Sequence, residues 1–341
     1  MKFEVLSAVN PACRQRWLEF LSSWSENPPP FCFPSYMKLF LEPSSTPHLL
    51  TYETDKSKAM LPLVVRRIPG IDSGVDAIGP YGYASAYWQG EVDEQEEFWN
   101  LVRSWAIENQ IISVVMRLPV IPDSSKVWPF SRHRVKINVV RSIDAWEDLW
   151  ADFDHKVRKN YKKASRLGLT FEMSSQPSKL DAFLEIYEKT MARRAAEGQY
   201  TRAQYWFPRV FQELEGQCLI ALASVGSRVV SAEAVLHDGL DLYSFLGGTL
   251  SDYYQFRPND FLKCELMRWA RGIGFTNYVL GGGYQDGDGI FRYKSSFAPR
   301  GEKEFFIGEW IVLESTYQQL VHDQQRQKID SAPRTYPAYR R

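Results

Sequence analysis

Residues 280–297 read LGGGYQDGDGIFRYKSSF, and our interpretation of the C-terminal half of the chain starts from this stretch. A buried strand is predicted over 276–281, and it runs into a loop with glycines at 281, 282, 283, 287 and 289. Glycine permits backbone conformations closed to other residues and lets a ligand come close to the chain. We therefore predict a ligand-facing loop over 281–289, with Gly282 and Gly283 against the substrate.

Tyr293 and Lys294 follow this loop directly. A lysine held beside such a loop can stabilise a developing oxyanion or hold a phosphate. The alternative is a flexible turn followed by an ordinary surface lysine. We predict that Lys294 and Tyr293 are catalytic.

Several other sites are excluded. Counting from Asp286, the twelfth position is Phe297, where an EF-hand requires glutamate. The chain contains no P-loop, dinucleotide-binding, GxSxG or HExxH motif. The four cysteines form no CxxC pair, and no Cys/His cluster has zinc spacing, so we expect free thiols and no metal.

A basic segment, HKVRKNYKKASRLG, covers residues 155–168. It predicts a helix over 155–167 that Asp154 caps and Gly168 ends. The six lysines and arginines have no acid among them, and the faces away from the core would suit a polyanion. Arg158 and Lys163 are the candidate anion ligands. The alternative is a solvated face whose acidic partners lie on neighbouring elements.

A second anion site is predicted at the start of a helix over 259–272. The residues Arg257, Pro258 and Asn259 open this helix, because proline fits a first turn and asparagine can cap free N–H groups. A helix N-terminus with an arginine beside it attracts anions. The alternative is simple punctuation between a strand and a helix.

The remaining chain alternates helices and strands. In the second half we predict helices over 178–197, 201–214 and 314–328, and strands over 217–225, 228–237, 240–247 and 303–313. In the first half we predict helices over 14–23 and 92–109, and strands over 60–67, 111–117 and 134–141, with Pro62 placing the 60–67 strand at a sheet edge. The similar order in both halves indicates a duplicated α/β unit.

An aromatic loop, GPYGYASAYW, covers residues 79–88. Tyr81 and Tyr83 are candidates to stack on a sugar or base. Aromatic packing between the two halves explains the same residues equally well.

Composition bounds the class of protein. The chain has 341 residues, 44% of them hydrophobic, which predicts about two domains. Its 41 basic and 41 acidic residues cancel, so no overall field draws it to nucleic acid or membrane. We see no signal peptide and no apolar run of ~18 residues, and we expect a cytoplasmic enzyme without a membrane span.

Together, four motifs resemble the FemAB-like branch of the GNAT acyltransferase superfamily. They are RKNxxKAxxxG in the basic helix, YxxTMxRR in the next helix, SDYYxxxPNDFLxxExxRWAxxxGF over 251–275, and LGGG…DGxFRYKSSF. The resemblance runs from about residue 154 to 310, and GPYGYASAY matches a family loop more loosely.

This resemblance implies two tandem GNAT-like domains, each a mixed sheet flanked by helices. The first would cover 1–145 and the second 146–313, and the segment 314–341 is a candidate to complete the first. Founding members add amino acids from aminoacyl-tRNA to peptidoglycan precursors, and others are N-acetyltransferases linked to polysaccharide. Their Phe/Tyr–Lys pair falls on Tyr293 and Lys294. The arginine that holds the anionic acceptor falls on Arg193, since Thr190–Arg193 fits the T-x-x-R pattern.

The resemblance predicts an N-acyltransferase with no permanently bound cofactor. Acyl-CoA and aminoacyl-tRNA both remain as donors, because YQFRPNDF replaces the glycine-containing loop that ordinary GNAT enzymes use for CoA. Lys294 and loop N–H groups would stabilise the oxyanion, and Asp286, Asp288 or Glu233 would take the amine proton. The acceptor would be a small-molecule or glycan-precursor amine, with tRNA as a further partner; no oligomeric state is predicted. The alternative is a non-catalytic RNA- or sugar-nucleotide-binding protein on a transferase scaffold.

Overall fold

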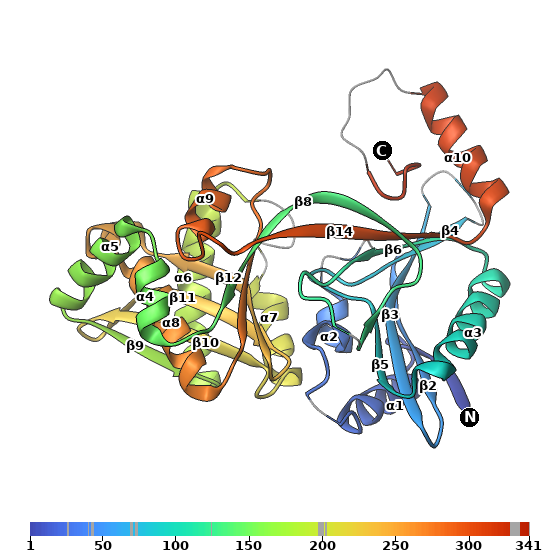
Figure 1. The fold of residues 1–341 in the computed structure, drawn as a ribbon, viewed down its shortest axis with the longest axis horizontal. Helices are drawn as coiled ribbons and strands as arrows, with labels where there is room; N and C mark the ends of the chain where they lie inside the picture. The colour runs from blue at the N-terminus through green and yellow to red at the C-terminus, as the bar shows by residue number, and fades with distance from the viewer. Residues whose placement is uncertain are drawn as a thin grey trace. The chain divides into compact units, whose positions relative to one another are not determined.

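The computed structural model describes the chain except residues 26, 40, 42–43, 69–70, 72–73, 124, 197–200, 202, 328–334 and 341. It divides into two compact units (Figure 1). Unit 1 comprises Met1–Trp24, Phe31–Val135 and Phe305–Arg341, and unit 2 comprises Ser25–Pro30 and Lys136–Glu304. Each is a mixed sheet with helices against it, so the predicted α/β class is confirmed.

The division falls within two strands, β8 (Ser131–Ser142) and β14 (Glu302–Ile311). The boundary that we predicted at 145/146 therefore lies inside unit 2. The chain from Phe305 onward belongs to unit 1.

Unit 1 has the strand order β1-β2-β3-β4-β6-β14, and β5 pairs with β3 and β7. Its strands are β1 (Lys2–Ser7), β2 (Thr46–Glu53), β3 (Ser57–Arg67), β4 (Val75–Ile78), β5 (Ala86–Gly90), β6 (Ile111–Arg117) and β7 (Lys126–Val127). Its helices are α1 (Pro11–Ser22), α2 (Pro34–Met37), α3 (Gln95–Glu108) and α10 (Glu314–Gln327). β14 pairs antiparallel with β6 from Ile307↔Arg117 to Ile311↔Ser113.

Strand β3 corrects one prediction, because it lies inside the sheet although it contains Pro62. On one side it pairs with β2, with Leu49 opposite Pro62. On the other side β5 pairs with Ser57–Met60 and β4 with Val64–Arg67. Pro62 lies in the gap between these two partners, where an interior strand tolerates a residue that cannot donate a backbone hydrogen bond.

A buried polar cluster joins the C-terminal residues to the sheet of unit 1. Asp76 on β4 is fully buried, and Arg66 binds its carboxylate at 3.0 and 3.1 Å. Arg340 binds the same carboxylate through Nε and, at 3.0 Å, through Nη2. The buried Tyr339 hydroxyl lies 2.8 Å from Ser113 Oγ on β6. Segment 335–340 is therefore part of the core of unit 1.

Unit 2 has the strand order β8-β13-β12-β11-β10-β9, in which only the β12–β13 pair is parallel. Its remaining strands are β9 (Leu169–Ser174), β10 (Cys218–Val225), β11 (Arg228–His237), β12 (Asp241–Thr249) and β13 (Asn277–Gly281). Its helices are α4 (Trp146–Asp152), α5 (His155–Arg166), α6 (Leu180–Arg193), α7 (Ala203–Glu213), α8 (Pro258–Ile273) and α9 (Gly289–Ser295). The close packing of α6 on β12 requires glycine at position 248, since a Cβ on Gly248 would lie 2.4 Å from Thr190 Oγ1 on α6.

Two predicted helix ends need correction. The Asp154 side chain makes no capping hydrogen bond to α5, although Gly168 follows that helix with φ +77° as expected. Helix α8 continues through Gly272 and ends at Ile273, with Gly274 as its left-handed cap at φ 101°.

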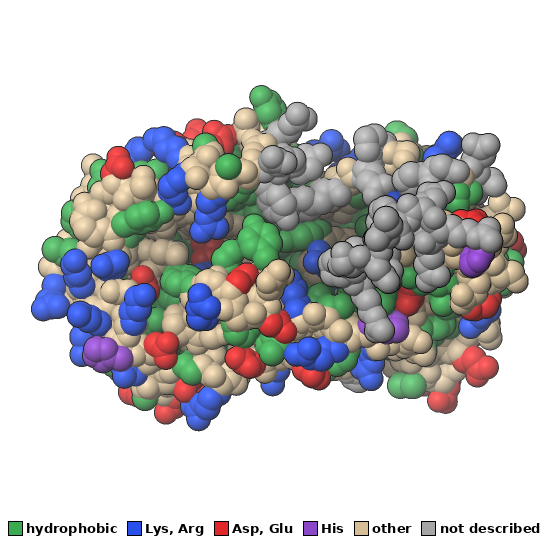
Figure 2. Space-filling view, turned by 90° about the horizontal axis from the view of Figure 1, so that it is seen from above, with side chains coloured by type: hydrophobic (Ala, Val, Ile, Leu, Met, Phe, Trp, Pro, Cys, Tyr) green, Lys and Arg blue, Asp and Glu red, His purple; other side chains and the backbone are tan. Residues whose placement is uncertain are grey.

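Lys and Arg side chains gather on the surface of unit 2 where α5 lies (Figure 2), so the cationic face of α5 is on the surface.

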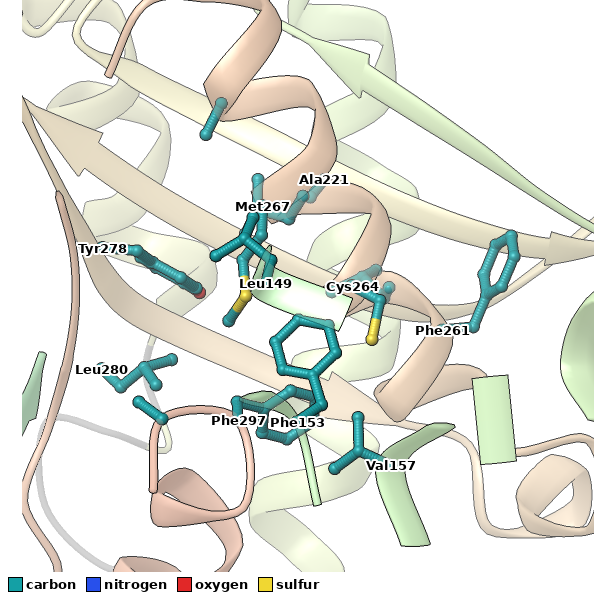
Figure 3. Packing of buried hydrophobic residues seen from close by; sticks show 14 of the residues in the cluster. Leu149, Phe153, Val157, Ala221, Phe261, Cys264, Met267, Tyr278, Leu280 and Phe297 are labelled. Carbon is teal, nitrogen blue, oxygen red and sulfur yellow. The ribbon is translucent and has the colours of Figure 1, made fainter. Parts of the chain in front are cut away.

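One hydrophobic core of unit 2 lies between its sheet and helices α4, α5 and α8. Phe153 and Phe297 meet edge to face with ring centroids 6.1 Å apart, near Cys264 and Met267 of α8 (Figure 3). Tyr278 and Leu280 of β13 enter the same cluster. The strand that leads into the glycine loop is therefore anchored in the core.

Among the described residues, no helix combines the length and apolar character that a bilayer crossing needs.

Candidate active site

The glycine loop is folded around Asp288. Gly281 ends β13 with φ 75°, and α9 begins at Gly289 with Asp288 as its N-cap. The Asp288 carboxylate accepts hydrogen bonds from the N–H groups of Phe291 and Tyr284, both at 2.7 Å, and from Gln285 at 3.2 Å. These bonds hold the pKa of Asp288 below its ordinary value. Asp288 is therefore a poor base, and the N–H groups of Tyr284 and Gln285 are directed at Asp288 instead of at an oxyanion.

Gly282 and Gly283 allow the loop to pack on its own unit. A Cβ on Gly282 would lie 2.5 Å from Asn138 Oδ1, and one on Gly283 would lie 2.1 Å from Asp288 Oδ1. The glycines are thus required by contacts within the protein, which differs from the close substrate approach that we predicted. Lys136 of β8 also donates to the Gly283 carbonyl at 3.1 Å.

Lys294 lies on α9 and turns back to the loop. Its Nζ donates to the Gly282 carbonyl at 2.7 Å. Burial lowers its pKa to about 8, and the positive charges of Lys263 and Lys136 act in the same direction. Lys294 is therefore partly buried and tied to its own loop, and its catalytic role stays a prediction.

The Tyr293 hydroxyl is buried without a hydrogen-bond partner among the described residues. The ring packs edge to face on Phe297 at 5.2 Å. Burial raises the pKa of Tyr293 well above its ordinary value, and the charges of Asp260, Glu233 and Cys264 add to the effect. A buried hydroxyl without a partner calls for an explanation, and a bound substrate atom is one.

Glu233 belongs to a buried ion pair in the same domain. Lys263 of α8 donates to both of its carboxylate oxygens, at 2.8 and 2.7 Å, and to the Tyr278 hydroxyl at 3.0 Å. Ser244 and Tyr278 donate to Glu233 Oε1. With its oxygens so engaged, Glu233 fits a structural role better than the proton transfer that we predicted. Neither Lys263 nor Tyr278 was predicted from the sequence as a site residue, although Lys263 lies inside one of the quoted motifs.

Of the other carboxylates, Asp286 is exposed and accepts a hydrogen bond from the Ile137 N–H at 2.7 Å, so it ties the loop to β8. Asp260, which the sequence analysis did not single out, lies in the first turn of α8. Burial raises its pKa, and a hydrogen bond with the Asn160 side chain opposes that shift.

The three predicted anion ligands on α5 and α6 differ in their exposure and in their hydrogen-bond partners. Arg158 donates through Nη1 to backbone carbonyls at the end of α4, including Ala151 at 2.8 Å, so part of its guanidinium is structural. Lys163 is exposed on α5. Arg193 is exposed at the end of α6, where it donates to the Thr249 carbonyl at 3.1 Å and lies 5.3 Å from the Tyr254 ring centroid.

At the start of α8, Asn259 lies in the first turn and not at the capping position. Arg257 occupies that position with a left-handed backbone, φ 61° and ψ 40°, and makes no side-chain capping bond. The first-turn N–H groups of α8 thus have no side-chain cap from Arg257.

The aromatic loop of unit 1 divides between two roles. Tyr83 packs edge to face against Phe31 at 6.2 Å and Phe305 at 5.8 Å, and burial raises its pKa. Both partners belong to unit 1, so these contacts pack Tyr83 within its own unit. Tyr81 is 37% exposed, with the Arg117 guanidinium 5.1 Å from its ring centroid. Tyr81 therefore stays a candidate for stacking. No cluster of metal-ligating side chains occurs in the part of the chain that the structure describes.

Comparison with known proteins identifies the domain that holds these residues. Residues 151–295 match the family model of the acetyltransferase (GNAT) domain. This segment is a GNAT domain. Glu233, Lys263, Tyr293 and Lys294 all lie inside the matched segment.

Solved structures share the fold over nearly the whole chain. FemX superposes with a TM-score of 0.66 and 14% identity over 94% of this chain and 99% of that one. The C-terminal domain of a putative lysylphosphatidylglycerol synthetase from Agrobacterium fabrum has a TM-score of 0.56, 13% identity and coverage of 86% and 92%. A conserved protein from Bacteroides thetaiotaomicron has a TM-score of 0.55, 10% identity and coverage of 90% and 98%.

The family match confirms the GNAT part of the predicted resemblance over residues 151–295, and FemX shares its fold with this chain. At sequence identities this low, the solved structures show a shared fold and nothing further. A search of the curated proteins gave no match.

Proposed function

We propose that the GNAT domain transfers an acyl or aminoacyl group from an activated carrier to an amine, with Lys294 and Tyr293 at the reacting carbonyl. The observation that carries this proposal is a partly buried amine, that of Lys294, adjacent in sequence to the buried hydroxyl of Tyr293, which has no hydrogen-bond partner among the described residues. Both lie on the short helix α9, which Asp288 and the packed glycine loop hold in place.

The transfer needs a hydrogen-bond donor that stabilises the negative charge developing on the carbonyl oxygen. The amine nitrogen attacks the carbonyl carbon, the new C–N bond forms, and the carbonyl oxygen becomes an oxyanion. Lysine has three N–H donors, and the Gly282 carbonyl takes one of them, so two can face the oxyanion. A donor fixed in a dry site stabilises the transition state more than the same donor in water. Collapse then breaks the C–S bond of a thioester or the C–O bond of an ester.

We keep both acyl donors, a CoA thioester and an aminoacyl-tRNA, in the proposal. A CoA thioester agrees with the GNAT assignment, and the first-turn N–H groups of α8 beside Arg257 would suit its pyrophosphate. An aminoacyl-tRNA would use the cationic surface of α5 and bind with a steep salt dependence. On the acceptor side, Arg193 is held by Thr249 and Tyr254 and would bind an anionic group of a small-molecule or glycan-precursor amine.

The first experiment compares acetyl-CoA, CoA and bulk tRNA by thermal shift at two salt concentrations, followed by transfer assays with a panel of amines. Stabilisation by a CoA ligand that salt barely changes supports the thioester donor. Stabilisation by tRNA that disappears at high salt supports the ester donor. Binding without turnover for every donor and amine would instead favour a non-catalytic binding protein.

Lys294 is tested against a matched lysine in contact with the same loop. We expect Lys294→Ala to lower kcat by about 10²–10³-fold, the usual loss for one oxyanion donor. Lys136→Ala removes a similar bond to the next carbonyl, that of Gly283, and should lower stability while kcat stays within a fewfold of wild type. Wild-type turnover in Lys294→Ala would disprove the catalytic assignment.

A further inference from the structure

Helix α5 carries positive charge on one side and buried apolar residues on the other. Four exposed cations recur at intervals of three or four positions, so they share one side of the helix: Lys156, Lys159, Lys163 and Arg166. We call them the cationic stripe, which runs over ten positions and is therefore about 15 Å long. Val157 and Ala164 lie on the opposite side and are buried in the core of unit 2.

The cationic stripe keeps its charge without ion pairs in the part of the chain that the structure describes. On α8, which packs against α5, Glu265 accepts a hydrogen bond from Tyr161. Asp260, on which the charge of Lys156 acts, shares a hydrogen bond with Asn160. The exposed acids on and just before α4 and α5 make no ion pair with the stripe either: Asp144, Glu147, Asp148 and Asp154. The stripe is therefore an excess of positive charge on a chain whose formal net charge is zero.

An apolar side chain lies beside this charge. Leu167 directly follows α5, four positions after Lys163, so it continues the side of the helix that the stripe occupies. Its side chain is 44% exposed. Cations with an exposed leucine among them suit a surface that is anionic outside and apolar beneath, which is the boundary of a bilayer of anionic lipids.

The aromatic residues next to α5 favour this lipid surface over RNA. Proteins that bind unpaired RNA stack its bases on exposed aromatic rings. Here the Lys162 ammonium lies 5.6 Å from the Trp150 ring centroid, and the Arg268 guanidinium lies 5.6 Å from that of Trp146. Both rings also pack against Tyr161, so they offer no open platform for a base.

The residue types in the stripe point the same way. Three of its four cations are lysines, which act as point charges, whereas arginine is the residue that grips single phosphates with a bidentate fork. An exposed leucine adds nothing to the binding of a phosphate backbone. A diffuse anionic surface therefore fits the stripe and Leu167 together better than a nucleic acid does.

We propose that the cationic stripe binds unit 2 to an anionic lipid surface, with the Leu167 side chain in the headgroup layer. Each cation close to such a surface strengthens binding by about fivefold, and the attraction is lost beyond a Debye length. The binding uses no transfer chemistry, so it is separate from the proposed function. An aminoacyl-tRNA on the same face would compete with it.

The test is co-sedimentation of the purified full-length chain with vesicles of equimolar phosphatidylcholine and phosphatidylglycerol, with vesicles of phosphatidylcholine alone as the reference. We expect binding to the mixed vesicles only, and its loss at about 1 M salt, where the Debye length is about 3 Å. Lys159→Gln combined with Lys163→Gln should weaken binding by about 25-fold, since two charges are removed. Leu167→Ser should weaken it by a smaller factor and leave its salt dependence unchanged.

The control removes the same charge elsewhere in unit 2. Lys189→Gln combined with Arg209→Gln changes exposed cations on α6 and α7 and should leave vesicle binding within about twofold of wild type. Both double variants should keep the wild-type Tm, because the side chains that they change are exposed. A loss of binding with an unchanged Tm is then due to the stripe.

Equal binding to both kinds of vesicle, or wild-type binding by the stripe variant, would overturn the inference. Binding of bulk tRNA that the stripe variant loses, with no vesicle binding by the wild type, would overturn it as well and would support the aminoacyl-tRNA donor instead. If the wild-type chain transfers no group from any donor, the proposed function fails, and vesicle binding still decides the role of the stripe.

Discussion

At the scale of single residues, the environment of Lys294 decides what its amine can do. The residue type and its position after the glycines were evident from the sequence. Its burial was not, because Lys263 lies thirty-one positions away on another helix and Lys136 lies on β8. The three amines come together only through the fold, and their mutual repulsion adds to the burial that lowers the Lys294 pKa.

The pH dependence of activity follows from this lowered pKa. Lys294 must be protonated to stabilise an oxyanion, and its pKa is about 8. We therefore expect kcat to fall as the pH rises through about 8, where a lysine at its ordinary value of 10.5 would stay charged. The measurement is a pH–rate profile of the wild type. A flat profile up to about pH 10 would show that the lysine charge is not used.

The same residue should affect stability. The folded-state pKa of Lys294 lies below that of the unfolded chain, so the unfolded chain binds more protons between about pH 8 and 10.5. The free energy of unfolding should therefore rise with pH across this window, by on the order of 3 kcal/mol at most, and Lys294→Met should lack the rise. Urea titrations of both proteins at about pH 7.5 and about pH 10 measure the difference.

At the scale of elements, α9 depends on one side chain for its start. Asp288 satisfies N–H groups of the loop and of the first turn of α9. We expect Asp288→Ala to lower Tm and to reduce kcat by about ten- to a hundredfold, because the helix that carries Lys294 loses its fixed position. Hydrogen exchange should report faster amides in 284–291, and unchanged exchange there would contradict the assigned role.

Helices and strands are also joined by the Glu233–Lys263 pair, whose members are 4% and 6% exposed. Lys263→Met should destabilise unit 2 by about 3–5 kcal/mol, since it leaves a carboxylate buried without its counter-ion. Adding Glu233→Gln should recover part of that loss. The exposed pair of Glu185 and Lys189 on α6 is the control, for which Lys189→Met should cost less than about 1 kcal/mol in the same denaturant titration.

At the scale of the whole molecule, each unit has hydrophobic clusters made of its own described residues. Arg340→Ala removes one of the arginines that pair with the buried Asp76 in unit 1. We expect a loss of about 1–3 kcal/mol in unit 1, with hydrogen exchange in unit 2 unchanged. Arg300→Ala removes an exposed arginine in unit 2 that pairs with Asp152, and it should change little, because Arg141 also pairs with this carboxylate. Equal loosening of both units in Arg340→Ala would contradict this expectation.

Periodicity predicted most elements, since local patterns fix helices and strands. The differences came from contacts that no local pattern shows. Pro62 is tolerated inside a sheet because two partner strands divide there, and Gly283 packs against Asp288, five residues further along the same loop. The sequence pointed to Lys294 and Tyr293 through adjacent motifs, but Lys263 stands out only once its burial is known. That residues 1–145 form a GNAT-like domain of their own stays a prediction.

The path of β14 has a consequence for the growing polypeptide on the ribosome. Strand β6 pairs with β4 on one side and with residues 307–311 of β14 on the other. A nascent chain that has emerged only to about residue 300 therefore presents one side of β6 with its N–H and C=O groups unpaired, and such an edge invites pairing with other chains. The N-terminal portion must wait through the synthesis of the entire GNAT domain before its own sheet can close.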